Sequence, residues 1–108
     1  MKHTPIEEAV AARTALAIAP DGREFTVTAK IGRPYPAADG DWACSVDLTP
    51  LYPRLIDQHG VDSWQALQLC YRLVAQLLGG FEQDGGRLYW TNTREPMDAA
   101  DLLPRWPA

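Results

Sequence analysis

Histidine is the side chain that most readily exchanges protons near neutral pH, and the 108-residue chain contains only His3 and His59. His59 follows Asp57 by two positions and precedes Asp62 by three, so it could act as an acid or base beside either carboxylate. Nucleophilic catalysis also needs a nucleophile and an orienting group that converge on the base, and no nucleophile points to His59. We therefore predict no catalytic residues and interpret His59 as a solvated loop side chain.

The sequence also lacks the residue patterns of a metal site or a phosphate site. Cys44 and Cys70 stand alone, and neither a His-x-x-x-His nor a Cys-x-x-Cys pair occurs, so a structural zinc site is not expected. The Asp-Gly-Asp segment 39–41 lacks the further oxygen donors of a calcium loop and is typical of a hairpin loop. The glycine pairs 79–80 and 85–86 lack the spacing and the lysine of a phosphate-binding loop. We predict no metal, no cofactor and two buried free thiols.

Charge and composition narrow the possible functions further. Fourteen acidic and ten basic residues give a net charge of −4, which argues against binding to a nucleic-acid backbone. The N-terminus carries early acids and no apolar stretch of signal-peptide length, and no later stretch approaches the ~18 apolar residues of a membrane span. With 46% hydrophobic and 22% charged residues, the chain is typical of one globular domain, 1–108. We expect a cytoplasmic protein with no nucleic-acid or membrane partner.

Alternating apolar residues predict the strands. Residues 10–19 alternate, and the Pro-Asp-Gly turn at 20–22 predicts a hairpin into a second strand, 25–31. A third alternation, 42–48, should pair antiparallel with the second strand, and a fourth strand is predicted at 87–91. The fold class is therefore α+β, with a three-stranded antiparallel meander. One face of the first strand carries Val10, Ala12, Thr14, Leu16 and Ile18.

A long amphipathic helix over residues 62–78 is expected to pack on this sheet. Asp62 can cap the helix and Gln65 can return the bond to the Asp62 backbone, and the glycines at 79–80 should end it. A polar stripe covers about a quarter to a third of the helix circumference at roughly 100° per residue. The apolar remainder is more than one sheet face covers. The stripe consists of Gln65, Gln68, Arg72 and Gln76.

The chain itself could cover this surplus apolar surface. A helix start at Thr4, a turn of helix in 54–60 and a short C-terminal helix within 95–103 are the segments available. Residues 92–108 could instead be a loosely packed tail.

The alternative is that a partner covers part of the surplus. Trp64, Tyr71 and Leu78 are the candidate contacts on the helix, and Trp106 is a fourth near the end of the sequence. The partner would be another protein or a second copy of this chain.

Several segments together resemble a family of short, uncharacterised bacterial proteins. In that family, a helix that begins at a Gly-x-Asp-Ser-x-Gln-Ala-Leu motif follows strands and precedes an Arg-Leu-x-Trp-like strand, which residues 87–90 match. The resemblance spans roughly residues 12–90 and implies a fold without an activity. The segments that carry it are 12–16 (Ala-Arg-Thr-Ala-Leu), 31–34 (Ile-Gly-Arg-Pro), 42–44 (Trp-Ala-Cys) and 60–67 (Gly-Val-Asp-Ser-Trp-Gln-Ala-Leu).

Three functional hypotheses follow. By analogy with other small acidic α+β proteins, the first is a non-enzymatic protein-binding domain, such as an immunity protein that neutralises a bacterial toxin by occlusion. The second is a small enzyme or ligand-binding protein with a pocket between helix and sheet, lined by Trp42, Cys44 and Tyr71. The third is a structural homodimer.

Overall fold

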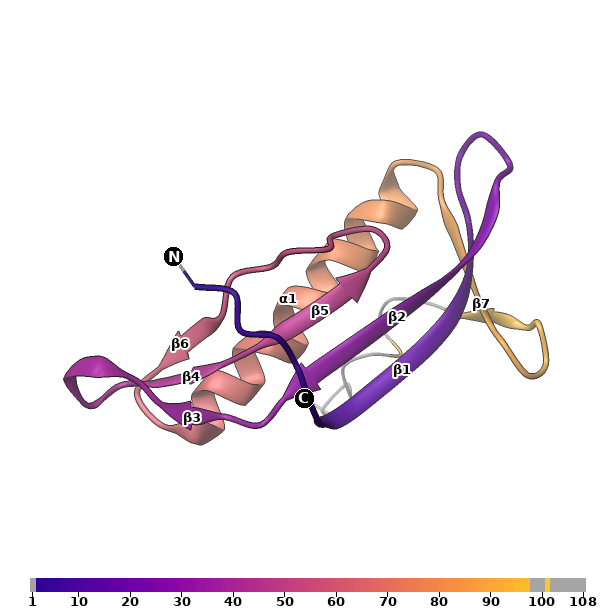
Figure 1. Ribbon diagram of the computed structural model, residues 1–108. Helices are drawn as coiled ribbons and strands as arrows, with labels where there is room; N and C mark the ends of the chain where they lie inside the picture. Colours follow the sequence, from indigo (N-terminus) through magenta and orange to yellow (C-terminus); the bar gives the residue numbers. More distant parts are fainter. Residues whose placement is uncertain (1, 98–100, 102–108) are drawn as a thin grey trace, which may run out of the picture.

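The computed structural model describes residues 2–97 and residue 101, which form two antiparallel sheets and one long helix (Figure 1). The helix runs diagonally behind the strands in that view. In chain order the elements are β1 (Ala9–Ile18), β2 (Glu24–Gly32), β3 (Tyr35–Pro36), the short 3-10 turn η1 (Ala38–Gly40), β4 (Trp42–Cys44), β5 (Val46–Thr49), β6 (Gln58–Gly60), α1 (Ser63–Gln83), β7 (Arg87–Trp90) and β8 (Pro96–Met97).

The strand layout corrects the expected three-stranded meander. The described strands number eight, in a five-stranded sheet of order β5-β2-β1-β7-β8 and a three-stranded sheet of order β3-β4-β6. Pro34 and Pro36 have no backbone N–H to donate, so the chain cannot continue as a single strand, and β2 and β3 are separate strands. The expected third strand is likewise divided into β4 and β5. The Gly32 amide, at the end of β2, donates to the carbonyl of Ser45, the residue between β4 and β5, at 2.9 Å.

The first hairpin confirms the predicted turn. The Ala19 amide donates to the Arg23 carbonyl at 2.8 Å, and the Gly22 amide donates to the Ala19 carbonyl at 2.9 Å. Gly22 has φ +89°, which a residue without a Cβ adopts without strain. β1 and β2 then pair antiparallel, with Ala17 opposite Phe25.

The inner face of the sheet combines large side chains from β2 with small ones from β1. Val27 and Ile31 of β2 are buried at 2% and 4% exposure, and Ala15 and Ala17 of β1 at 3% and 0%. The buried face of β1 is thus opposite to the one that carries its larger residues, such as Leu16. Small side chains on β1 therefore lie beside larger ones from β2 on the buried face of the sheet.

The helix contributes a narrow buried line to this core. Ala66, Cys70, Val74 and Leu78 follow one another at four-residue spacing, and all four are buried. This spacing is the one that places residues on a single helix face.

The helix does not end at Gly79 and Gly80 as expected, but continues to Gln83. Phe81, one residue beyond the glycines, meets Phe25 edge to face with ring centroids 6.1 Å apart. Such a contact offsets part of the ~1 kcal/mol cost of a glycine within a helix. The chain leaves the helix instead at Gly85, which has φ +102°.

Two further helical predictions are wrong. Residues 4–7 form no helix, because the Thr4 side chain and amide bind Asp57 instead of capping a turn. Within 54–60, residues Gln58–Gly60 form β6 and pair with β4. In the expected C-terminal helix within 95–103, Pro96–Met97 is strand β8, and all later residues of that range except Asp101 lie outside the described part of the chain.

Candidate binding surfaces

The start of α1 carries the most exposed large apolar side chains of the described chain. Val61 is 72% exposed and Trp64 is 74% exposed, and together they form what we call the helix-start surface. The Asp62 carboxylate accepts a hydrogen bond from the Gln65 amide at 2.8 Å, as predicted for the cap. The Gln65 side-chain oxygen accepts from the Val61 amide at 2.8 Å, one residue earlier than expected. These two bonds fix the backbone that carries Val61 and Trp64.

The close contact between β6 and α1 further fixes this surface. Gly60 ends β6 opposite Trp42 of β4, and it is buried. A Cβ at Gly60 would lie 2.6 Å from the Ala66 amide nitrogen, a backbone atom that cannot move aside. The helix therefore begins directly against the sheet, and the helix-start surface projects from a rigid junction.

The surroundings of this surface are acidic. Residues 34–71 contain five aspartates and a single arginine, Arg54, but no lysine or glutamate. Asp41 precedes Trp42, the partner of Gly60, so Asp41 and Val61 leave the sheet at the same end. Asp39, Asp41 and Asp62 are all exposed. Asp62 therefore lies between Val61 and Trp64 in the chain, and Asp41 leaves the sheet at the same end as Val61.

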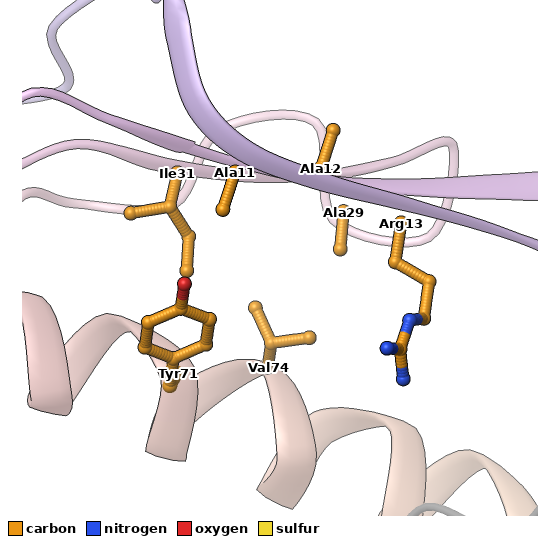
Figure 2. A pocket seen from close by; sticks show the side chains of 7 residues that line it. All are labelled: Ala11, Ala12, Arg13, Ala29, Ile31, Tyr71 and Val74. Carbon is orange, nitrogen blue, oxygen red and sulfur yellow. The ribbon is translucent and has the colours of Figure 1, made fainter. Parts of the chain in front are cut away.

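A second apolar feature, which we call the helix–sheet groove, lies between α1 and the first half of β1 (Figure 2). Its volume is about 160 Å³. In Figure 2, the Tyr71 ring rises from the helix with its hydroxyl toward Ile31, and Val74 points into the gap beside it. The groove is lined by Ala11, Ala12, Arg13, Ala29, Ile31, Tyr71 and Val74.

Arg13 connects the groove with the C-terminal part of the chain. Its guanidinium lies over the Trp90 ring, 5.0 Å from the centroid, a stacked arrangement that favours a cation. Its Nη1 atom also donates to the Asp101 carbonyl at 3.0 Å. The one charged side chain that lines the groove is therefore held by two contacts.

The described chain also contains a polar cluster around the buried Asp57, formed with the half-buried Thr4 and Tyr35, which we call the Asp57 cluster. Asp57 is 3% exposed. Its carboxylate accepts from the Thr4 hydroxyl at 2.5 Å, from the Thr4 amide at 2.9 Å and from the Tyr35 hydroxyl. The Asp57 amide in turn donates to the Lys2 carbonyl at 2.7 Å. These bonds attach the N-terminal segment to the edge of the sheet.

Hydrogen bonding keeps the Asp57 carboxylate charged. Burial alone would raise the pKa of Asp57, but the hydrogen bonds from Thr4 and Tyr35 outweigh it, and the pKa lies below its ordinary value. The pKa of Tyr35 is raised, chiefly because of burial and because its hydroxyl donates to that carboxylate. The Asp57 carboxylate is thus a charged group with three hydrogen-bond donors, and we interpret the cluster as structural.

Neither the histidines nor the cysteines are among the residues that form the helix-start surface or line the groove. His3 donates from Nδ1 to the Leu55 carbonyl at 2.6 Å, and His59 is exposed on β6. Cys44 and Cys70 are free thiols with 0% exposure. A hydrogen bond with Cys44 and burial raise the pKa of the Cys70 thiol, so it stays protonated and unreactive. The expected buried free thiols are confirmed.

The candidate partner contacts occupy different environments. Trp64 and Tyr71 are exposed, at 74% and 37%, while Leu78 lies in the core at 3% exposure, so it cannot contribute to an open surface. Trp106 lies outside the residues that the structure describes. Of the pocket residues expected between helix and sheet, Tyr71 lines the groove, and Trp42 and Cys44 do not.

Residues 2–97 and 101 bring no three His, Cys, Asp or Glu side chains together as a metal site. No helix in the same part of the chain is long and apolar enough to cross a membrane.

The structure defines a small α+β domain in which one helix packs on antiparallel sheets, with exposed apolar side chains at the helix start. The chain belongs to the family described as a domain of unknown function, DUF6968, whose model matches residues 11–99. This match agrees with the resemblance to an uncharacterised family. No curated protein and no solved structure matches the chain.

Proposed function

We propose that this protein is a non-enzymatic protein-binding domain that docks a basic protein surface onto the helix-start surface, with Trp64 as the anchor. The observation that carries this proposal is the 74% exposure of a tryptophan on a helix whose start is fixed by capping bonds. Tryptophan is enriched among the residues that dominate binding energy at protein interfaces, where its ring fills a recess in the partner.

The chemistry of the partner follows from the charges around Trp64. Exposed Asp39, Asp41 and Asp62 favour a partner with basic residues around an apolar recess. Such charges accelerate association and disfavour acidic partners. Neutralisation of a toxin by occlusion, the role of an immunity protein, is the specific form of this function that we propose.

The proposal is tested with three full-length proteins used as affinity baits in extracts of the source cell: wild type, Trp64→Ala and Tyr52→Ala. Tyr52 is a matched control, because it is an aromatic residue 42% exposed in the segment after β5. The partner should be retained by wild type and Tyr52→Ala and lost with Trp64→Ala. Calorimetry on the identified partner should give at least about 30-fold weaker binding for Trp64→Ala, equivalent to ~2 kcal/mol.

Measurements at different salt and protein concentrations test whether the partner is a basic protein or a second copy of the chain. Binding to a basic partner should weaken as salt rises, because exposed charges are screened. Equal retention of the same proteins by wild type and Trp64→Ala would contradict the proposal. So would concentration-dependent dimerisation in light scattering that Trp64→Ala abolishes, since that result would assign the surface to a homodimer.

A further inference from the structure

Arg13 places a positive charge at one end of the helix–sheet groove. In Figure 2 its side chain extends from β1 toward α1, while the Tyr71 ring rises from α1 at the other end, with Val74 between them. The guanidinium contacts described above are to the Trp90 ring and to the Asp101 carbonyl, and neither group carries a negative charge. A guanidinium has five N–H donors, and the Asp101 carbonyl accepts from one nitrogen, Nη1. Within residues 2–97 and 101, Arg13 is thus held in place and keeps donors for an anion.

The rest of the groove is apolar and small. Three of its lining residues, Ala29, Ile31 and Val74, are buried, so they form a packed floor. The volume of about 160 Å³ is close to the ~150 Å³ of an apolar cavity that holds benzene. Small-molecule sites are mostly apolar, with a few polar groups that orient the ligand. A ligand for this groove therefore has a single ring or a short aliphatic chain.

We propose that the helix–sheet groove binds a small monocarboxylate, with the carboxylate on Arg13 and the apolar body over Val74, beside the Tyr71 ring. Guanidinium N–H groups match the geometry of a carboxylate, and the apolar floor favours burial of the body. A carboxylate fits better than a phosphate, because Arg13 and Tyr71 are the polar side chains among the lining residues. The groove shares no residue with the helix-start surface, so this proposal and the protein-binding proposal can fail independently.

Benzoate and benzyl alcohol are suitable probes, because they share a ring and differ in the carboxylate. The full-length protein is titrated with each while NMR follows the methyl groups of Ala29 and Val74 and the Tyr71 ring. Benzoate should shift these signals saturably, and benzyl alcohol should bind at least about tenfold more weakly, because it lacks the charge-assisted hydrogen bonds. The absence of a saturable shift with benzoate up to about 10 mM would overturn the proposal. Equal affinities for the two probes would also overturn it.

Charge variants test the role of Arg13. Arg13→Gln should weaken benzoate binding at least about tenfold and leave the affinity for benzyl alcohol unchanged. Arg23→Gln is the matched control, because the Arg23 guanidinium also lies over an aromatic ring, 5.6 Å from the Phe25 centroid, and Arg23 is not among the residues that line the groove. Its benzoate affinity should equal that of wild type. Equal losses in the two variants would overturn the proposal, since binding would then depend on net charge alone.

A space-filling variant tests the groove separately from the charge. Ala11 is half-buried and lines the groove, so the larger side chain of Ala11→Leu should occupy the space of the ligand while Arg13 is kept. Benzoate should no longer shift the Val74 and Tyr71 signals, although the spectrum of the variant remains that of a folded protein. Benzoate that binds Ala11→Leu as tightly as wild type would overturn the proposal, because the carboxylate would then bind outside the groove.

Discussion

The described part of the chain covers the two sides of α1 to different extents. On the β5 side, the segment between β5 and β6 packs Leu51 and Leu55 against the core and ends at Asp57, whose carboxylate binds the N-terminal segment. On the β1 side, Tyr71 remains 37% exposed beside the helix–sheet groove. The apolar pattern of the helix does not distinguish these sides. The polar bonds of the Asp57 cluster, across more than fifty positions of sequence, determine which side the described chain covers.

A buried carboxylate can hold a neighbouring segment in place because it needs hydrogen-bond donors in place of water. An anion removed from water without partners is very costly, and Asp57 avoids this cost through three hydrogen bonds from two residues. Each bond fixes a donor in space, so the N-terminal segment is held at a defined position. Apolar contacts such as those of Leu55 add stability without this directional restraint.

The largest expected effect comes from truncating α1 on its core face. Leu78→Ala should lower the free energy of unfolding by about 3 kcal/mol, because Leu78 is 3% exposed and its loss leaves a cavity. Tyr71→Ala, on the β1 side, should cost about 1 kcal/mol, because part of the ring is in water already. Urea denaturation of both variants measures the difference. Equal losses would mean that the β1 side is as tightly packed as the core.

Removal of the carboxylate of the Asp57 cluster should have the next largest effect. Asp57→Ala leaves the Thr4 and Tyr35 hydroxyls without their acceptor, and should cost about 2 kcal/mol. The amide of Thr4 should also exchange its hydrogen faster. Asp41→Ala is the control, because Asp41 is exposed, and it should change stability by less than about 0.5 kcal/mol. An unchanged exchange rate at Thr4 in Asp57→Ala would show that other contacts hold the N-terminal segment.

The strand positions could largely be predicted from sequence, whereas their division between two sheets could not. Alternation locates β1, β2 and β7 because side-chain period is a local property. Where β2 gives way to β3 depends on which backbone groups find partners across the sheet, which is not local. The helix end was missed for the same reason, since the contact between Phe81 and Phe25 joins distant positions.

The same difference between local and non-local signals applies to the residues of the candidate sites. The capping bond of Asp62 was predictable, because donor and acceptor are three residues apart. Thr4, Tyr35 and Asp57 give no sequence signal, because their types are common and their spacing carries no period. Arg13 was missed because it falls among alanines on the inner face of β1, where an apolar residue is the usual occupant.

The pH dependence of stability should report on the Asp57 cluster. A carboxyl whose folded-state pKa is lowered contributes stability above its unfolded pKa of about 3.9, and this contribution is lost as the pH falls through the folded-state value. Wild type should therefore lose stability below about pH 4 more steeply than Asp57→Asn. Urea denaturation between neutral and acidic pH measures both slopes. Parallel slopes would show that the Asp57 carboxyl titrates alike in the folded and unfolded states.

The smallest effect should arise at the helix start. Asp62→Ala removes the bond to the Gln65 amide and should cost about 1 kcal/mol, while Ser63→Ala, at an exposed neighbouring position, should cost less than about 0.5 kcal/mol. Trp64→Ala should also leave stability nearly unchanged, because Trp64 makes little contact with the fold at 74% exposure. The contrast with Leu78→Ala follows from burial. A side chain that costs the fold nothing when removed is free to be used at an interface, and stability measured beside partner binding in Trp64→Ala separates the two roles.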